Sequence, residues 1–108
     1  MNKILVEVSV AELLDKVSIL EIKQDKIKDP EKLKFIKNEH SILKSQLDLN
    51  VKKDKMLEKL FNTLKEINSR LWVIEDDKRL CEKEQNFGDK FIKLSRDVHF
   101  LNDDRAKI

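Results

Sequence analysis

The spacing of apolar residues predicts helices for most of this chain. Apolar side chains recur three and four positions apart, which places them on one face of a helix. The pattern is most regular from Leu57 to Ile74 and continues at Cys81, as in a heptad repeat. Four helices are therefore expected, over residues 9–28, 30–47, 55–85 and 89–108.

Polar and turn-forming residues mark the ends of these helices. Ser9 stands three positions before Glu12, as in a capping box, and Pro30 suits the first turn of the second helix. Gly88 can take the left-handed conformation that ends the third helix. The link between the first two helices is so short that they should form an antiparallel hairpin. The predicted fold is all-α: a single domain over residues 1–108, an antiparallel bundle of about four helices with a long third helix.

A short β-branched segment precedes the first helix. Residues 1–8 are expected to form one extended strand, because the sequence from Lys3 to Val8 is KILVEV. No second strand pattern occurs in the sequence. A strand without a partner leaves its backbone N–H and C=O groups unpaired. This segment could therefore pair with the same segment of a second copy of the chain.

The charge pattern and the cysteine content bear on three properties: nucleic-acid binding, membrane binding and cellular location. The chain has 23 basic and 21 acidic residues, interleaved as on solvated helix faces. We therefore expect no nucleic-acid partner and no binding to a membrane surface. No apolar run approaches the roughly 20 residues of a membrane span. Cys81 is the only cysteine, which excludes an internal disulfide and favours a reducing, cytoplasmic location.

Several polar residues occupy or flank core positions of the expected bundle. Counting levels along antiparallel helices brings Gln24, Asn68 and Arg105 to about the same height. Glu21 should then be close enough to pair with Arg105. One interpretation is a structural ion pair at the edge of a narrow core, and the other is a polar pocket between helices. Glu21, Gln24, Asn68 and Arg105 form the candidate polar cluster.

A dense charged stretch, EDDKR, begins at Glu75. At 100° per residue, Glu75 and Asp76 point away from the apolar stripe and Asp77 lies at its shoulder, so the three carboxylates do not converge. Arg79 follows Glu75 by four positions, an order that favours a surface ion pair. We assign no catalytic residue, and we expect neither a cofactor nor a metal. The alternative function is a small all-helical enzyme, such as a metal-dependent nucleotide phosphohydrolase, because such enzymes use acid motifs on adjacent helices.

The unequal helix lengths indicate self-association. The third helix is expected to have about 31 residues and the first two about 18 each, so part of the third protrudes beside the fourth alone. Apolar residues continue in that part, among them Ile74, Leu80, Phe87 and Phe91. Burying one large apolar side chain is worth roughly 1.5–3 kcal/mol, so exposing several is unfavourable. We expect a homodimer or higher homo-oligomer with these four residues in its interface.

Nearly the whole chain resembles a family without an established activity. The resemblance is carried by the stretches VEVSVAELLDKVSILEIKQDKIKDPEKL, INSRLWVIEDDKR, FGDKF and NDDRAKI. These are similar to an uncharacterised, domain-of-unknown-function family of short helical proteins from bacteria, phages and marine metagenomes. The resemblance assigns no functional residue, and it implies that this chain stops early at Ile108. It also implies a link to glycosyltransferase and surface-polysaccharide systems. The expected function is therefore a self-associating helical interaction module, linked to such systems.

Overall fold

The computed structural model describes residues 4–108 and confirms the all-α fold. These residues form four helices and no strand. The helices are α1 (Val10–Lys26), α2 (Pro30–Asn50), α3 (Lys55–Lys83) and α4 (Asp89–Ala106). Of the extended segment expected over residues 1–8, residues 1–3 lie outside the described part. Residues 4–8 form no strand, since a strand needs a partner strand for its backbone groups.

Three of the four helices begin at a side-chain cap. The hydroxyl of Ser9 accepts a hydrogen bond from the Glu12 N–H (3.1 Å), and Asp29 caps α2 in the same manner. Asp54 accepts from the Leu57 N–H at 2.7 Å and starts α3. Each cap satisfies a backbone donor that the first turn of a helix leaves unpaired. These local bonds explain why the starts of the helices follow so closely from the sequence.

The end of α3 differs from the expectation. Gln85, and not Gly88, takes the left-handed conformation, with φ at 56°. The N–H of Asn86 donates to the carbonyl of Cys81 (2.7 Å), and that of Gln85 donates to Glu82 (3.1 Å). This is the hydrogen-bond pattern of a Schellman motif, which closes a helix end. Gly88 has φ at −78° and caps the start of α4 instead.

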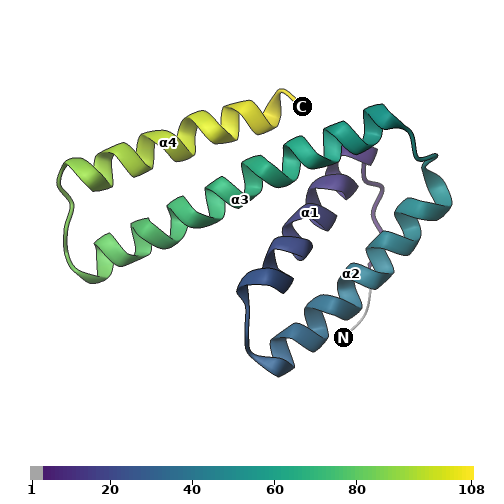
Figure 1. Ribbon diagram of the computed structural model, residues 1–108, viewed down its shortest axis with the longest axis horizontal. Helices are drawn as coiled ribbons and strands as arrows, with labels where there is room; N and C mark the ends of the chain where they lie inside the picture. The colour runs from purple at the N-terminus through teal and green to yellow at the C-terminus, as the bar shows by residue number, and fades with distance from the viewer. Residues whose placement is uncertain (1–3) are drawn as a thin grey trace.

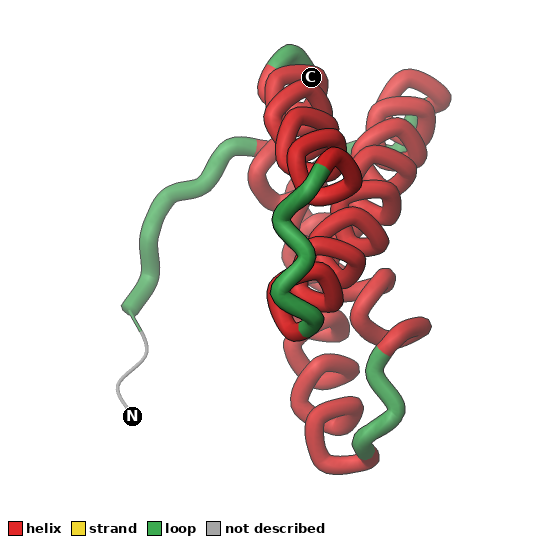
Figure 2. The backbone as a smooth tube through the Cα atoms, turned by 90° about the vertical axis from the view of Figure 1, so that its left-hand side faces the viewer, coloured by secondary structure: helices red, strands yellow, loops and turns green. Residues whose placement is uncertain are grey.

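The four helices form two hairpins that meet where α1 crosses α3. Close helix packing occurs between α1 and α2, between α1 and α3, and between α3 and α4. Figure 1 shows α3 as the long diagonal helix, with α4 along its outer half and α1 crossing below its inner half. Figure 2 shows the segment before α1 running away from the helices. The bundle is therefore open, and α3 is its central element.

The buried side chains lie in two clusters along α3. Leu14, Leu47 and Leu64 come together where α1, α2 and α3 meet. Ile67, Leu71 and Leu101 form the second cluster, between α3 and α4. Ile108 packs against both clusters and joins them at the end of the chain. This arrangement follows from the heptad pattern of α3, whose apolar stripe first faces α1 and then α4.

Candidate functional site

A buried polar network lies at the crossing of α1 and α3. Asn68 of α3 is only 5% exposed. Its amide nitrogen donates to the carboxylate of Asp15 (2.7 Å) and to the hydroxyl of Ser18 (2.9 Å), both on α1. Its amide oxygen accepts from the guanidinium of Arg105 on α4 (3.2 Å). One side chain thus connects three helices, and its two amide donors and its acceptor oxygen all have partners.

Two members of the candidate polar cluster meet in this network, and two do not. Asn68 and Arg105 are hydrogen-bonded, as counting levels along the helices suggested. Glu21 does not pair with Arg105, which corrects the expected contact: its carboxylate binds His40 and Lys65. Gln24 is half-buried, and no side-chain hydrogen bond joins it to the described residues. The reason is the register of α1 on α3, in which Ser18, and not Gln24, lies against Asn68.

Asp15 and Ser18 are the partners that the sequence analysis did not identify. The hydroxyl of Ser18 is fully buried and donates to the backbone carbonyl of Asp15 (2.7 Å). Both residues look like ordinary surface positions of an amphipathic helix. The only signal in the sequence is their spacing of three, which puts them on the same helix face beside Leu14.

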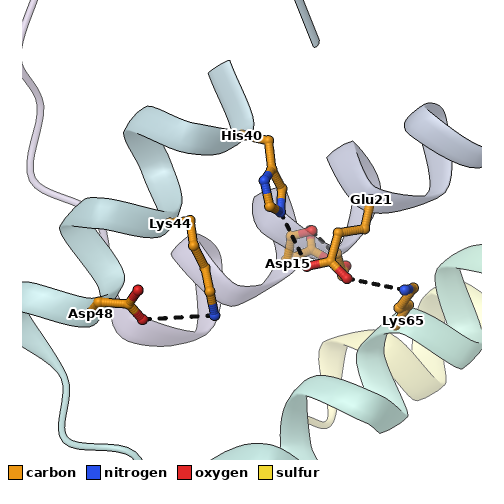
Figure 3. Close-up of polar contacts among 7 residues, drawn as sticks. Asp15, Glu21, His40, Lys44, Asp48 and Lys65 are labelled. Atoms are coloured by element: carbon orange, nitrogen blue, oxygen red, sulfur yellow. Dashed lines mark hydrogen bonds and ion pairs between the residues drawn. The ribbon is translucent and has the colours of Figure 1, made fainter. Parts of the chain in front are cut away.

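A second polar group ties α1 to both of its neighbours. Lys65 of α3 donates to one oxygen of the Glu21 carboxylate (3.0 Å), and His40 of α2 lies 3.2 Å from the other oxygen. Figure 3 shows the Glu21 carboxylate between these two side chains. Partial burial raises the pKa of Glu21, but the hydrogen bonds and charges of Lys65 and His40 outweigh it, and the net pKa is lowered. Glu21 is therefore a charged connection between α2 and α3.

A groove lies in the corner between α1 and the α3–α4 hairpin, and we call it the corner groove. Its volume is about 380 Å³. Its polar walls are Lys23, Asn68, Glu75, Arg79 and Arg105. Its apolar walls are Ile19, Ile22, Leu71 and Trp72. The groove thus holds three basic side chains against one acidic side chain, in a chain whose total charges nearly cancel.

A larger groove lies elsewhere on the described residues and has balanced charge. It measures about 540 Å³ and lies around the link between α2 and α3. Three lysines and three acids line it: Lys44, Lys53, Lys55, Asp48, Asp54 and Glu58. Lys44 and Lys53 both pair with Asp48, at 3.7 and 3.5 Å. Because its basic and acidic side chains are equal in number, this groove has no excess of charge that would favour a charged ligand.

The three acidic residues that begin at Glu75 lie in different surroundings. Asp76 is exposed and pairs with Arg79 at 3.1 Å, so the expected pair of Glu75 with Arg79 is replaced by one three positions apart. Glu75 instead lines the corner groove, and Asp77 is half-buried. Within residues 4–108, no three His, Cys, Asp or Glu side chains are grouped so as to hold a metal ion.

The four candidate interface residues lie on the outer part of the α3–α4 hairpin. Leu80 is 48% exposed and Phe87 is 54% exposed. Phe91 is half-buried, its ring meets that of Phe87 edge to face at 5.3 Å, and Lys78 lies over it. Ile74 packs inward against the cluster between α3 and α4. Leu80 and Phe87 are therefore the two that present the most apolar surface to solvent.

Comparison with known proteins identifies a family but no activity. Residues 4–108 match a family described as a family of unknown function (DUF6165), and the chain therefore belongs to that family. No curated protein and no solved structure matches the chain significantly. None of the helices formed by the described residues has both the length and the apolar character needed to cross a membrane.

Proposed function

We propose that this member of the DUF6165 family is a helical interaction module that self-associates through the outer part of the α3–α4 hairpin. We call this part the arm; it comprises residues 73–83 of α3, the connection, and residues 89–100 of α4. The observation that carries the proposal is the exposure of large apolar side chains there. Five of them are 48–54% exposed: Val73, Leu80, Phe87, Ile92 and Phe100.

The arrangement of the helices explains why the arm lacks an apolar cover. The α1–α2 hairpin packs on the inner half of α3, and the arm extends away from it in Figure 1. The inward faces of α3 and α4 cover one another, as the burial of Cys81 indicates. A pair of antiparallel helices leaves the outward sides of both helices in water. The apolar residues on those sides favour association, because burying each one fully would be worth roughly 1.5–3 kcal/mol.

We infer that the partner is a second copy of the same arm. Two arms related by a twofold axis would form a four-helix bundle in which the exposed residues of each arm cover those of the other. The ring pair of Phe87 and Phe91 would lie at the tip of such a bundle. Ile74 contributes only indirectly, by holding α4 against α3.

The mass of the protein in solution tests this proposal. Sedimentation equilibrium should give a dimer or larger species for the wild-type chain at micromolar concentration. Leu80→Glu should shift the protein to the monomer, since it would place a charge in the apolar interface. Leu49→Glu is the matched control: Leu49 is 79% exposed on α2, outside the arm, and its replacement should leave the mass unchanged. A wild-type monomer, or equal effects of the two variants, would contradict the proposal.

The cellular setting of the module is a separate part of the proposal. The single cysteine supports a cytoplasmic location, and the family resemblance supports a role beside enzymes that build surface polysaccharides. Disrupting the gene in its natural host should then change the amount or chain length of that polysaccharide. An unchanged polysaccharide would remove this link and leave the proposal of self-association standing.

A further inference from the structure

We propose that the corner groove binds a small ring compound that carries a phosphate or carboxylate group. The inference does not depend on self-association: Glu75 and Arg79 line the groove and belong to the arm, but none of the five exposed apolar residues proposed for the interface lines the groove. The groove volume of about 380 Å³ lies within the usual range of small-molecule sites, roughly 300–1,000 Å³.

The charge of the groove favours an anion. Lys23, Arg79 and Arg105 line it, and Glu75 is the only acid among them. Arg79 is paired with Asp76, outside the groove lining. Within the described part of the chain, no carboxylate forms an ion pair with Lys23 or Arg105. These two cations are therefore available to a ligand, whereas Lys44 and Lys53 of the larger groove share Asp48.

Arg105 is held in position before any ligand arrives. Its guanidinium has five N–H donors, and one of them is bonded to the amide oxygen of Asn68. Asn68 is itself fixed by Asp15 and Ser18, so this support is rigid. An arginine that is already ordered loses less side-chain entropy when it binds an oxyanion. Its remaining donors can form the two parallel hydrogen bonds that phosphates and carboxylates accept.

The apolar side of the groove favours a ring next to the anionic group. Trp72 is half-buried and lies there with Ile19, Ile22 and Leu71. A tryptophan face packs well against the flat face of another ring. Trp72 lies outside the heptad stripe of α3, so the sequence pattern gives it no role in the core. The ligand that fits both sides has a compact apolar ring and one strongly charged group.

The fluorescence of Trp72 gives a direct measurement of binding. The chain has one tryptophan and no tyrosine, so its emission reports on the corner groove. Titration with phenyl phosphate and with benzoate should give saturable changes, and comparison of the two distinguishes phosphate from carboxylate. Inorganic phosphate and phenol, each containing half of the proposed ligand, should bind at least about tenfold more weakly.

Variants of the basic residues test the assignment. Arg105→Met should weaken phenyl phosphate binding by about tenfold or more. Arg70→Met is the matched control, because it removes the same charge from an exposed position of α3 outside the groove. If Arg105→Met does not fold, Lys23→Gln replaces it, since Lys23 takes no part in the Asn68 network. Leu80→Glu should dissociate the proposed dimer and leave the affinity for phenyl phosphate unchanged. This result would separate the inference from the proposed function.

Three outcomes would overturn the inference. The first is the absence of a saturable change with both phenyl phosphate and benzoate. The second is equal affinity of the Arg105→Met and Arg70→Met proteins, or of the Lys23→Gln and Arg70→Met proteins if the former variant is unfolded. The third is equal binding of phenol or of inorganic phosphate alone, which would show that the groove does not recognise both halves of the ligand.

Discussion

The crossing of α1 and α3 and the arm are stabilised in different ways. At the crossing, side-chain hydrogen bonds run from one helix to another, as between Asp15 and Asn68 or between Glu21 and Lys65. On the arm, the side-chain ion pairs stay within one helix, as between Asp76 and Arg79 in α3. Contact between the two helices of the arm includes the buried Cys81 and a cation–π contact of Lys78 with the ring of Phe91.

The two regions therefore differ in what their contacts determine. Those at the crossing set the position of α1 on α3, whereas those of the arm hold its own two helices. A buried hydrogen bond between two helices forms at only one relative position, so the network around Asn68 fixes how α1 lies on α3. An ion pair between side chains three or four positions apart stabilises its own helix by roughly 0.2–0.5 kcal/mol. Such a pair does not fix the position of a neighbouring helix. The arm is therefore a regular helical hairpin that carries partly exposed apolar side chains.

The largest expected difference between the crossing and the arm is in the free energy of unfolding that an apolar side chain contributes. Leu14 at the crossing is 1% exposed, and Leu14→Ala should lower the free energy of unfolding by about 2–5 kcal/mol. Leu80 on the arm is 48% exposed, and Leu80→Ala at high dilution should lower it by less than about 1 kcal/mol. Urea unfolding followed by circular dichroism measures both. Equal losses would mean that the arm belongs to the core.

The fold could be predicted from the sequence because its signals are local. The starts of α1, α2 and α3 depend on Ser9, Asp29 and Asp54, whose side chains bond to backbone groups two or three positions away. The end of α3 was misassigned because Gln85 adopts the left-handed conformation in place of the nearby glycine. A Schellman motif depends on backbone hydrogen bonds, and these allow a residue other than glycine at a small cost.

The candidate site could be predicted only in part, because it depends on the register in which the helices pack. Periodicity gives the face of each residue but not the neighbour that the face meets. Counting levels puts Gln24 at the height of Asn68, and in that register Glu21 should meet Arg105. In the structure Asp15 and Ser18, and not Gln24, lie against Asn68, and Glu21 faces Lys65 and His40. The corner groove, lined by residues of α1, α3 and α4, has no counterpart in the sequence pattern.

The next effect concerns the polar network that fixes the crossing. Asn68→Ala would leave Asp15, Ser18 and Arg105 without their shared partner, and should lower the free energy of unfolding by roughly 2–3 kcal/mol. Asn62→Ala is the matched control, because Asn62 is exposed on the same helix; its effect should be within about 0.5 kcal/mol. Sedimentation of Asn68→Ala should match the wild-type protein. A change in its mass would show that the crossing and the arm are coupled.

The smallest effect, and the one with a pH signature, is expected at Glu21. Its pKa in the folded protein is lowered from 4.5, because the hydrogen bonds and charges of Lys65 and His40 outweigh the effect of burial. A lowered pKa means that the folded state holds the proton less tightly than the unfolded state, so the stabilisation is complete above pH 4.5 and is lost as the pH falls through the folded pKa.

Glu21→Gln should therefore lower the free energy of unfolding by up to about 1 kcal/mol at neutral pH, as expected for a partly exposed ion pair. The difference from the wild-type protein should shrink as the pH falls below 4.5. Glu39→Gln, at an exposed position of α2, removes the same charge and should show a much smaller difference at neutral pH. Urea unfolding at a series of pH values measures all three proteins. A Glu21→Gln difference that stays constant or grows in acid would show that the carboxylate does not join α2 to α3.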